Sequence, residues 1–204
     1  MESRRAILLG SLGLLSSCIA GCLSESPSEG TYQSIGGMGI EESSTTHPEI
    51  ELDVGFTQEG TRNEPPKIAI SLTNTGSVKT IGFGSHVPLS DFLGESADGG
   101  DKLFLVPEES SGLSARDLNG DGEFELIPEE KPDDCWKTGD KPIRADVLRE
   151  RRVSMNESVT GEYSVLVFEG NVSCNGRYRF SEHLQTRDDE NFEMSFELVN
   201  TAES

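Results

Sequence analysis

Hydrophobic and polar residues alternate in short runs along most of the chain after residue 48. In the clearest run Ile68, Ile70 and Leu72 occupy every second position, and Gly76 follows within a turn-like segment. A period of two is typical of a β-strand with one buried face, and Gly, Asn, Asp and Pro between such runs are typical of turns. The runs with this pattern span residues 50–54, 68–73, 78–83, 102–106, 123–127, 158–168, 176–180 and 192–199.

This pattern predicts an all-β fold. About eight strands, each with one apolar face, predict an antiparallel β-sandwich of about seven to nine strands in which two sheets pack their inward-facing residues together. We place this domain at residues 49–200. A small closed barrel is the main alternative. Only residues 143–153 have a weakly helical pattern.

The N-terminal residues carry the layout of an export signal. Arg4 and Arg5 precede one apolar run, residues 6–20, which is shorter than the roughly 20 residues that a membrane-spanning helix needs. The paired arginines and the apolar residues behind them resemble the twin-arginine signal, which in that family directs the export of folded proteins. The run ends in Ala20, Gly21 and Cys22, which resembles the lipobox of prokaryotic lipoproteins. An uncleaved signal anchor is the alternative.

The lipobox resemblance implies that residues 1–21 are removed as a signal peptide and that Cys22 carries a lipid. The mature protein would then be anchored in the cell membrane and face the extracellular side. Residues 22–48 are rich in Ser, Glu, Gly and Thr, and such a segment cannot bury enough surface to offset its ordering entropy. We therefore expect a disordered tether with a reach on the order of 30 Å, in which His47 has no partner.

The chain has four cysteines. Cys18 would leave with the signal peptide and Cys22 would be acylated, so that Cys135 and Cys174 remain for one disulfide. Export places this pair in an oxidising compartment, where a disulfide persists. In the chain-entropy model it would stabilise the fold by about 4 kcal/mol. Free thiols are one alternative; a two-cysteine metal site is another, but it lacks a CxxC spacing and a nearby pair of histidines.

The chain is strongly acidic, with 37 acidic and 17 basic residues and a net charge of −20. This excludes ordinary nucleic-acid binding, because Lys and Arg supply the affinity for phosphates. The acidic residues are dispersed over the chain, and the pattern resembles proteins of extremely halophilic archaea. At about 1 M salt the Debye length is about 3 Å, so the self-repulsion of such a surface is screened. A surface for cationic partners or metal ions is the alternative.

One acidic segment reproduces the first half of a calcium loop. The candidate ligands are Asp117, Asn119, Asp121, Glu123 through its carbonyl, and Glu125. They occupy the first, third, fifth, seventh and ninth positions, with Gly122 at the sixth. The twelfth position holds Pro128, so a bidentate acid would have to come from the two glutamates that follow. We expect structural calcium here and no other cofactor; a turn rich in Asp, Asn and Gly is the alternative.

Two Asn-x-Ser sequons, at Asn156 and Asn171, are candidate glycosylation sites of an exported surface. No GxSxG, HExxH, P-loop or dinucleotide motif occurs in the sequence. Within the predicted domain only His86 and His183 could serve as imidazole bases, and we expect structural roles for both. We therefore expect no enzymatic activity.

Three segments support a more specific resemblance. Residues 67–77, 156–159 and 175–180 together resemble the immunoglobulin-like domains of secreted prokaryotic lipoproteins. In those domains the strand that would contain Ile70 and Leu72 and the strand that would contain Tyr178 lie in facing sheets. Trp136 directly follows Cys135, whereas in antibody domains the tryptophan lies between the two cysteines. Cys135 is therefore expected to tie residues 128–142 to the turn before Tyr178.

Together these features predict a lipid-anchored extracellular β-sandwich that acts as a non-enzymatic binding or structural module at the cell envelope. The expected partners are the membrane, through the lipid, and an unknown protein or small molecule that contacts loops such as 97–101 and 110–122. One alternative is a ligand-binding lipoprotein associated with a transporter. A secreted protease inhibitor or an enzyme is a further alternative.

Overall fold

A computed structural model describes residues 33–35, 37–97, 99–109, 113–117, 126–129, 135–144, 147–171, 173–188 and 190–201. These residues form strands and no helix, which confirms the all-β prediction. The strands are β1 (Gln33–Ile35), β2 (Met38–Thr45), β3 (Ile50–Gln58), β4 (Lys67–Asn74), β5 (Lys79–Phe83), β6 (Leu93–Ser96), β7 (Lys102–Pro107), β8 (Leu113–Asp117), β9 (Lys137–Thr138), β10 (Asp140–Arg144), β11 (Arg149–Val153), β12 (Ser158–Phe168), β13 (Gly176–Thr186) and β14 (Asn191–Asn200).

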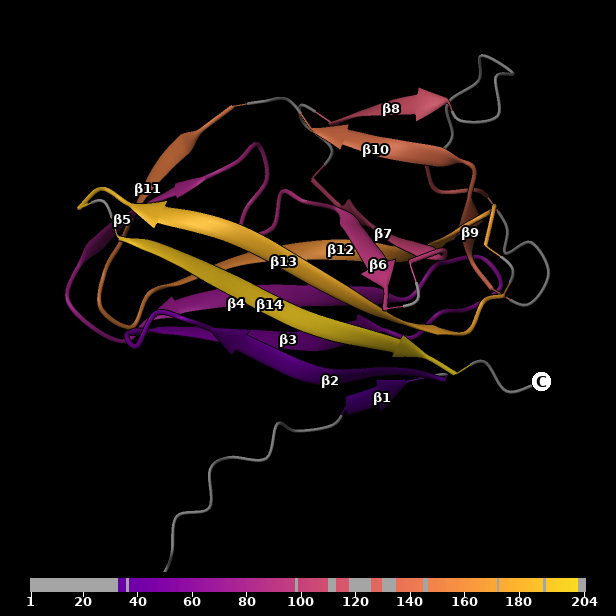
Figure 1. Ribbon diagram of the computed structural model, residues 1–204, viewed down its shortest axis with the longest axis horizontal. Helices are drawn as coiled ribbons and strands as arrows, with labels where there is room; N and C mark the ends of the chain where they lie inside the picture. Colours follow the sequence, from indigo (N-terminus) through magenta and orange to yellow (C-terminus); the bar gives the residue numbers. More distant parts are fainter. Residues whose placement is uncertain are drawn as a thin grey trace, which may run out of the picture.

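Twelve of the strands form one sheet that folds over into two facing layers, while β8 and β10 form a separate pair (Figure 1). One layer has the order β1-β2-β14-β13 and continues through β5 to β11; the other has the order β6-β7-β12-β4-β3, with β9 beside β12. The layers join at one corner, where β13 pairs with β6. The pairing is antiparallel except between β9 and β12. The arrangement is sandwich-like, with more strands than the seven to nine expected.

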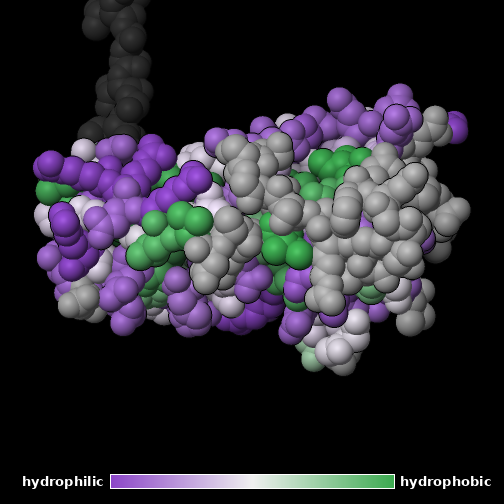
Figure 2. All heavy atoms as spheres, turned by 90° about the horizontal axis from the view of Figure 1, so that it is seen from above, coloured by the Kyte–Doolittle hydropathy of each residue, from purple (hydrophilic) through white to green (hydrophobic). Residues whose placement is uncertain are grey.

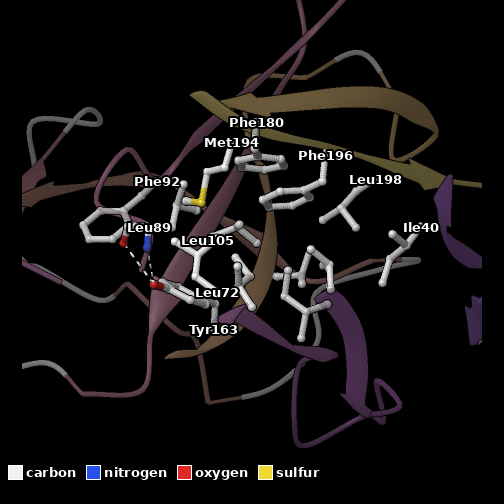
Figure 3. Close-up of a cluster of buried hydrophobic side chains, with 14 of the residues drawn as sticks. Ile40, Leu72, Leu89, Phe92, Leu105, Tyr163, Phe180, Met194, Phe196 and Leu198 are labelled. Carbon is white, nitrogen blue, oxygen red and sulfur yellow. Dashed lines mark hydrogen bonds between the residues drawn. The ribbon is translucent and has the colours of Figure 1, made fainter. Parts of the chain in front are cut away.

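The main core lies between the two layers. Ile68, Ile70 and Leu72 of β4 are at most 1% exposed, as their alternation predicts. Phe180 of β13 and Phe196 of β14, in the opposite layer, stack at a centroid distance of 5.1 Å. They face the side chains of the layer that contains β4 (Figure 3). The strands that the immunoglobulin-like resemblance expects in facing sheets therefore do lie in opposite layers. Each fully buried Ile, Leu or Phe contributes about 1.5–3 kcal/mol.

A second, smaller hydrophobic cluster covers the outer face of β7 and β12. It contains Val106, Trp136 and Leu166. The Trp136 Nε1 atom donates a hydrogen bond to the Thr61 carbonyl at 2.9 Å, which satisfies the polar end of a buried indole. Because β7 and β12 are covered on both faces, they are apolar over consecutive positions rather than at alternate ones.

The Cys135–Cys174 disulfide, with an S–S distance of 2.02 Å, lies next to this smaller cluster, because Cys135 directly precedes Trp136. Cys135 precedes β9, which pairs with β12 in one layer, and Cys174 precedes β13 in the other. The bond therefore joins segments of both layers and ties the residues around Trp136 to the turn before β13. The predicted pairing is confirmed.

The prediction of a tether up to residue 48 is wrong for its second half. Residues 33–35 and 38–45 form β1 and β2, and β2 pairs with β14. Met38 and Ile40 are buried. His47 is also buried, and its Nε2 atom lies 3.3 Å from Glu190 Oε2. The segment has few apolar residues because most of β2 faces solvent, so its pattern alone does not distinguish a sheet strand from a tether. Residues 1–32 lie outside the described residues.

The weak helix expected at residues 143–153 is also wrong. The segment contains the end of β10 and all of β11, and β11 pairs with β5 along its whole length. Arg and Leu favour helices intrinsically, but the ladder to β5 overrides that preference. Of the strand expected at 123–127, residues 126–127 form a bend and the rest lie outside the described residues. No helix in the described residues has the length and hydrophobicity needed to cross a membrane.

Candidate functional site

The loop between β5 and β6, residues 84–92, dips into the molecule instead of following its surface. Ser85, His86, Leu89, Ser90 and Phe92 are each at most 6% exposed. Loops usually stay at the surface because their backbone polar groups need partners. A buried loop with three polar side chains therefore requires a dedicated set of hydrogen bonds.

Both layers supply those hydrogen bonds. From β12, the Tyr163 hydroxyl donates to the Leu89 carbonyl at 3.0 Å and accepts from the Leu89 N–H at 3.1 Å (Figure 3). From β13, the buried Glu182 carboxylate accepts from the Ser90 N–H at 3.1 Å and the Asp91 N–H at 2.7 Å. Burial raises the pKa of Tyr163 well above its usual value, so its hydroxyl keeps the proton that it donates. The loop is thus fixed from two sides.

His86 is the ionisable side chain within this loop. Its Nδ1 atom lies 3.0 Å from Ser85 Oγ, and its ring packs edge-on against Phe92. Its Nε2 atom is buried and makes no hydrogen bond to any described residue. Burial lowers the pKa of His86 and Arg149 lowers it further, although the backbone and carboxylate of Glu109 oppose the shift. His86 is therefore neutral at pH 7.

A cavity of about 250 Å³ lies against this loop. Its lining includes six ionisable side chains: His86, Glu108, Glu109, Arg149, Arg151 and Glu162. Arg149 and Arg151 are two apart on β11 and so project from the same face of the strand. The carboxylates come from the segment after β7 and from β12. Cationic and anionic side chains thus line the same small space.

The carboxylates and the arginines of the cavity differ in how far they are already paired. Glu108 lies 2.9 Å from Lys67 Nζ and accepts a hydrogen bond from Ser164 Oγ at 2.7 Å. Arg151 lies at the longer distance of 3.9 Å from Glu157. Arg149 and Arg151 are exposed, so they can receive a carboxylate from outside, and Arg binds carboxylates through two parallel hydrogen bonds. The cavity is smaller than the roughly 300–1,000 Å³ of most small-molecule pockets.

Two larger hollows occur elsewhere on the described surface. One of about 320 Å³ lies between Phe92 and Ile143, and one of about 630 Å³ follows the outer face of β13 beside Arg177. Arg177 is already paired with Glu41 and, at 2.9 Å, with Glu197. We therefore regard the cavity at Arg149 and Arg151 as the better candidate site.

Among the described residues, the face that includes β10 and β11 is mostly hydrophilic, with separated hydrophobic patches (Figure 2). Leu148, which immediately precedes β11, is 73% exposed, and Val147 is 44% exposed. Together with the arginines of β11, these side chains form an exposed edge of mixed character. Aromatic residues, Met and Arg are the side chains enriched at protein interfaces, and here Arg is combined with apolar neighbours.

The predicted calcium site lies largely outside the described residues. Asp117 is the last residue of β8, where its backbone pairs with Asp140 of β10. The other candidate ligands, Asn119, Asp121, Glu123 and Glu125, are not among the described residues. Within the part of the chain that is described, no cluster of His, Cys, Asp and Glu suits a metal ion. Calcium binding at the predicted loop stays a prediction.

The other predicted sites have different outcomes. Arg4, Arg5 and Cys22 lie outside the described residues, so export and lipidation stay predictions. Asn156 and Asn171 both lie in turns and are described. Of the two predicted contact loops, 97–101 is described except at residue 98, and most of 110–122 is not.

Sequence reasoning missed the arginines of the cavity because they fell within the expected helix. One signal could have identified them: Arg149, Arg151 and Arg152 lie within four positions of a chain whose net charge is −20. A local basic cluster is unusual against such a background. No family model, no curated protein and no solved structure matches this chain.

Proposed function

We propose that this protein is an exported, lipid-anchored binding module that contacts a partner at the cell envelope through the β11 edge and the adjoining cavity. The observation that carries the proposal is the position of Arg149 and Arg151. They lie on β11, at the opposite edge of the layer from β1. Since β1 is the first described strand after Cys22 in the sequence, β11 lies across the whole width of the layer from the strand nearest the proposed anchor (Figure 1).

The chemistry of this edge favours a partner that presents carboxylates next to apolar groups. Arg149 and Arg151 are exposed and offer planar donors, while Leu148 offers apolar surface. A cavity of about 250 Å³ accepts a side chain of the partner rather than a large ligand. Since the rest of the chain is strongly acidic, a partner with carboxylates is repelled elsewhere and oriented toward this edge.

The same region does not favour catalysis. The contact between Ser85 Oγ and His86 Nδ1 at 3.0 Å has the residue types of a nucleophile and its base. Ser85 is 4% exposed and His86 is 6% exposed, and the cavity that both line is smaller than most small-molecule pockets. The tight hydrogen bonding of residues 84–92 opposes displacement of the loop. A structural role for this pair supports the binding proposal.

The test has an anchoring arm and a contact arm, both in the full-length chain. Cys22→Ser is expected to move the protein from the membrane fraction to the medium and to remove the lipid from its intact mass. For the contact arm, a photoreactive amino acid replaces the exposed Leu148. Irradiation of intact cells is expected to give a crosslinked product of defined mass.

Arg149→Gln combined with Arg151→Gln is expected to reduce that crosslinked product at least tenfold. Arg152→Gln is the matched control, because Arg152 projects from the opposite face of β11 and does not line the cavity. A product of equal yield in all three proteins, or no product at all, would contradict the proposed contact surface.

A second candidate function is the capture of a small zwitterionic solute. The mixed charge of the cavity favours it, since Arg149 and Arg151 suit a carboxylate and Glu162 suits an ammonium group. Titration calorimetry with glycine and with glycine betaine would then give heat with the wild type and none with the double arginine variant. The absence of heat in the wild type at millimolar ligand would remove this candidate.

A further inference from the structure

The two sequons differ sharply in how their asparagines are placed. Asn156 lies in the exposed turn between β11 and β12, and its backbone has a φ of 60°. Asn tolerates this left-handed conformation better than most residues. Its backbone N–H donates to the Asn74 carbonyl at 2.6 Å, whereas its carboxamide makes no hydrogen bond to any described residue. The reactive Nδ2 atom is thus open to solvent.

Asn171, in contrast, uses its carboxamide to hold two segments together. Its Nδ2 atom donates to the Lys102 carbonyl at 2.8 Å, and its Oδ1 atom accepts from the Lys102 N–H at 2.9 Å. This two-point contact fixes the turn after β12 against the first residue of β7. A sugar on Nδ2 would have to occupy the space of the Lys102 backbone.

The serines of the two sequons differ as well. Ser173, in the second sequon, donates to the Asn175 carbonyl at 3.2 Å and accepts from the Asn175 N–H at 2.8 Å. It is therefore part of a closed turn. Ser158, in the first sequon, is exposed at the start of β12 and shares one hydrogen bond with Thr73 Oγ1 at 2.7 Å. The first sequon therefore offers an exposed asparagine whose carboxamide has no partner among the described residues, whereas in the second the carboxamide is held by the Lys102 backbone.

The proposed route of export determines whether the different placement of the two asparagines affects glycosylation. A twin-arginine signal implies that the chain is already folded when it leaves the cytoplasm, so glycosylation outside would act on the folded domain. We propose that Asn156 is the N-glycosylated residue of this protein and that Asn171 is left unmodified. This inference rests on the proposed export of the chain.

The transfer requires a lipid-linked oligosaccharide as the donor. A bond forms between Asn156 Nδ2 and the anomeric carbon of the sugar, and the bond from that carbon to the lipid phosphate oxygen breaks. The amide nitrogen loses one proton, and the lipid phosphate leaves as the anion. The reaction is therefore a group transfer without any change in oxidation state.

A glycan at Asn156 would stand beside the proposed binding edge. Glu157, the next residue, lies 3.9 Å from Arg151 of β11. Because β5 is the only described strand that pairs with β11, the other edge of β11 could pair with the strand of another molecule. A bulky sugar at the adjacent turn would hinder such pairing. The modification would thus hinder edge-to-edge pairing at the Val153 end of β11.

The experiment is glycopeptide mass spectrometry and intact-mass measurement on the full-length chain, expressed in its native host. Ser158→Ala is expected to remove the glycan mass, and the matched Ser158→Thr variant, which preserves the sequon, is expected to retain it. Asn156→Gly should also remove the glycan while keeping the left-handed turn. Asn171→Gln should leave the glycan mass unchanged.

A glycan on Asn171, or an exported wild type without a glycan on Asn156, would overturn this inference. The membrane and medium fractions of the same culture distinguish this result from failure of the proposed function. If the protein is exported and anchored but Asn156 is bare, the present inference alone fails. If the protein is bare and remains unprocessed in the cytoplasm, both fail.

Discussion

Gly161 illustrates how a single residue controls the position of the buried loop. A Cβ atom at this residue would lie 2.2 Å from the Val87 carbonyl oxygen and 2.9 Å from the Tyr163 hydroxyl. Because the nearest atom belongs to the backbone, it cannot move aside by a change of rotamer. Residue 161 must therefore remain a glycine for the loop to lie against β12.

Gly161→Ala is therefore expected to reduce the free energy of unfolding by about 1–3 kcal/mol, as overpacking of a tight core does. Denaturant unfolding measures this change. Gly100→Ala is the control, because a Cβ there meets nothing within 4 Å; it should change stability by no more than about 0.5 kcal/mol. Equal stability of both variants would contradict the close contact.

His86 predicts a pH dependence of stability. Burial depresses its pKa in the folded state, whereas the unfolded chain has the ordinary value of about 6.5. Below that value the unfolded state binds a proton that the folded state does not, so stability is lost as the pH falls from about 7 toward 5. Unfolding midpoints at pH 5, 6 and 7 should show a weaker dependence in His86→Gln. An unchanged slope in His86→Gln would contradict the buried neutral state.

At the scale of the elements, β2 is the strand that the sequence pattern did not predict. It pairs with β14 and buries Met38 and Ile40. A chain that lacks residues 1–37 keeps this strand, whereas a chain that lacks residues 1–48 loses it. The longer deletion should lower the free energy of unfolding by at least about 3 kcal/mol, since each buried side chain contributes about 1.5–3 kcal/mol. Equal denaturation midpoints of the two deletions would show that β2 contributes nothing.

Strands whose apolar residues alternate or form a continuous run could be predicted closely from the sequence. The run at 158–168 coincides with β12, and the run at 68–73 lies within one residue of each end of β4. In contrast, β2 and β11 owe their structure to neighbours that pair with them. The partner of β2 lies about 150 residues away, and no local pattern reports such a contact. The disulfide could be predicted because the expected cleavage and lipidation would leave a single pair of cysteines.

The candidate site could be predicted far less well than the fold. His86 could be identified as an imidazole, but its burial depends on Tyr163 and Glu182, which anchor the loop from opposite layers. Arg149 and Arg151 reach the cavity only because β11 pairs with β5. Each of these contacts joins residues that are far apart in the chain, so only the tertiary structure brings them together.

At the scale of the whole molecule, the net charge of −20 predicts a stability that depends on salt. The Debye length falls from about 10 Å at 0.1 M salt to about 3 Å at 1 M, which screens repulsion between the dispersed carboxylates. The melting temperature should therefore rise steadily in sodium chloride between these concentrations. An unchanged melting temperature would contradict a surface adapted to salt.

The first and last parts of the chain in the sandwich lie side by side at the start of β2. The Thr201 N–H and hydroxyl both donate to the Gly37 carbonyl, at 2.6 Å and 3.0 Å. Residues 37 and 201 could therefore be joined by a short linker, and the chain could be reopened at an exposed turn such as 154–157. The fold is thus suited to circular permutation. A permuted chain would begin beside β11, so a lipid anchor attached to its new N-terminus would turn the proposed binding edge toward the membrane.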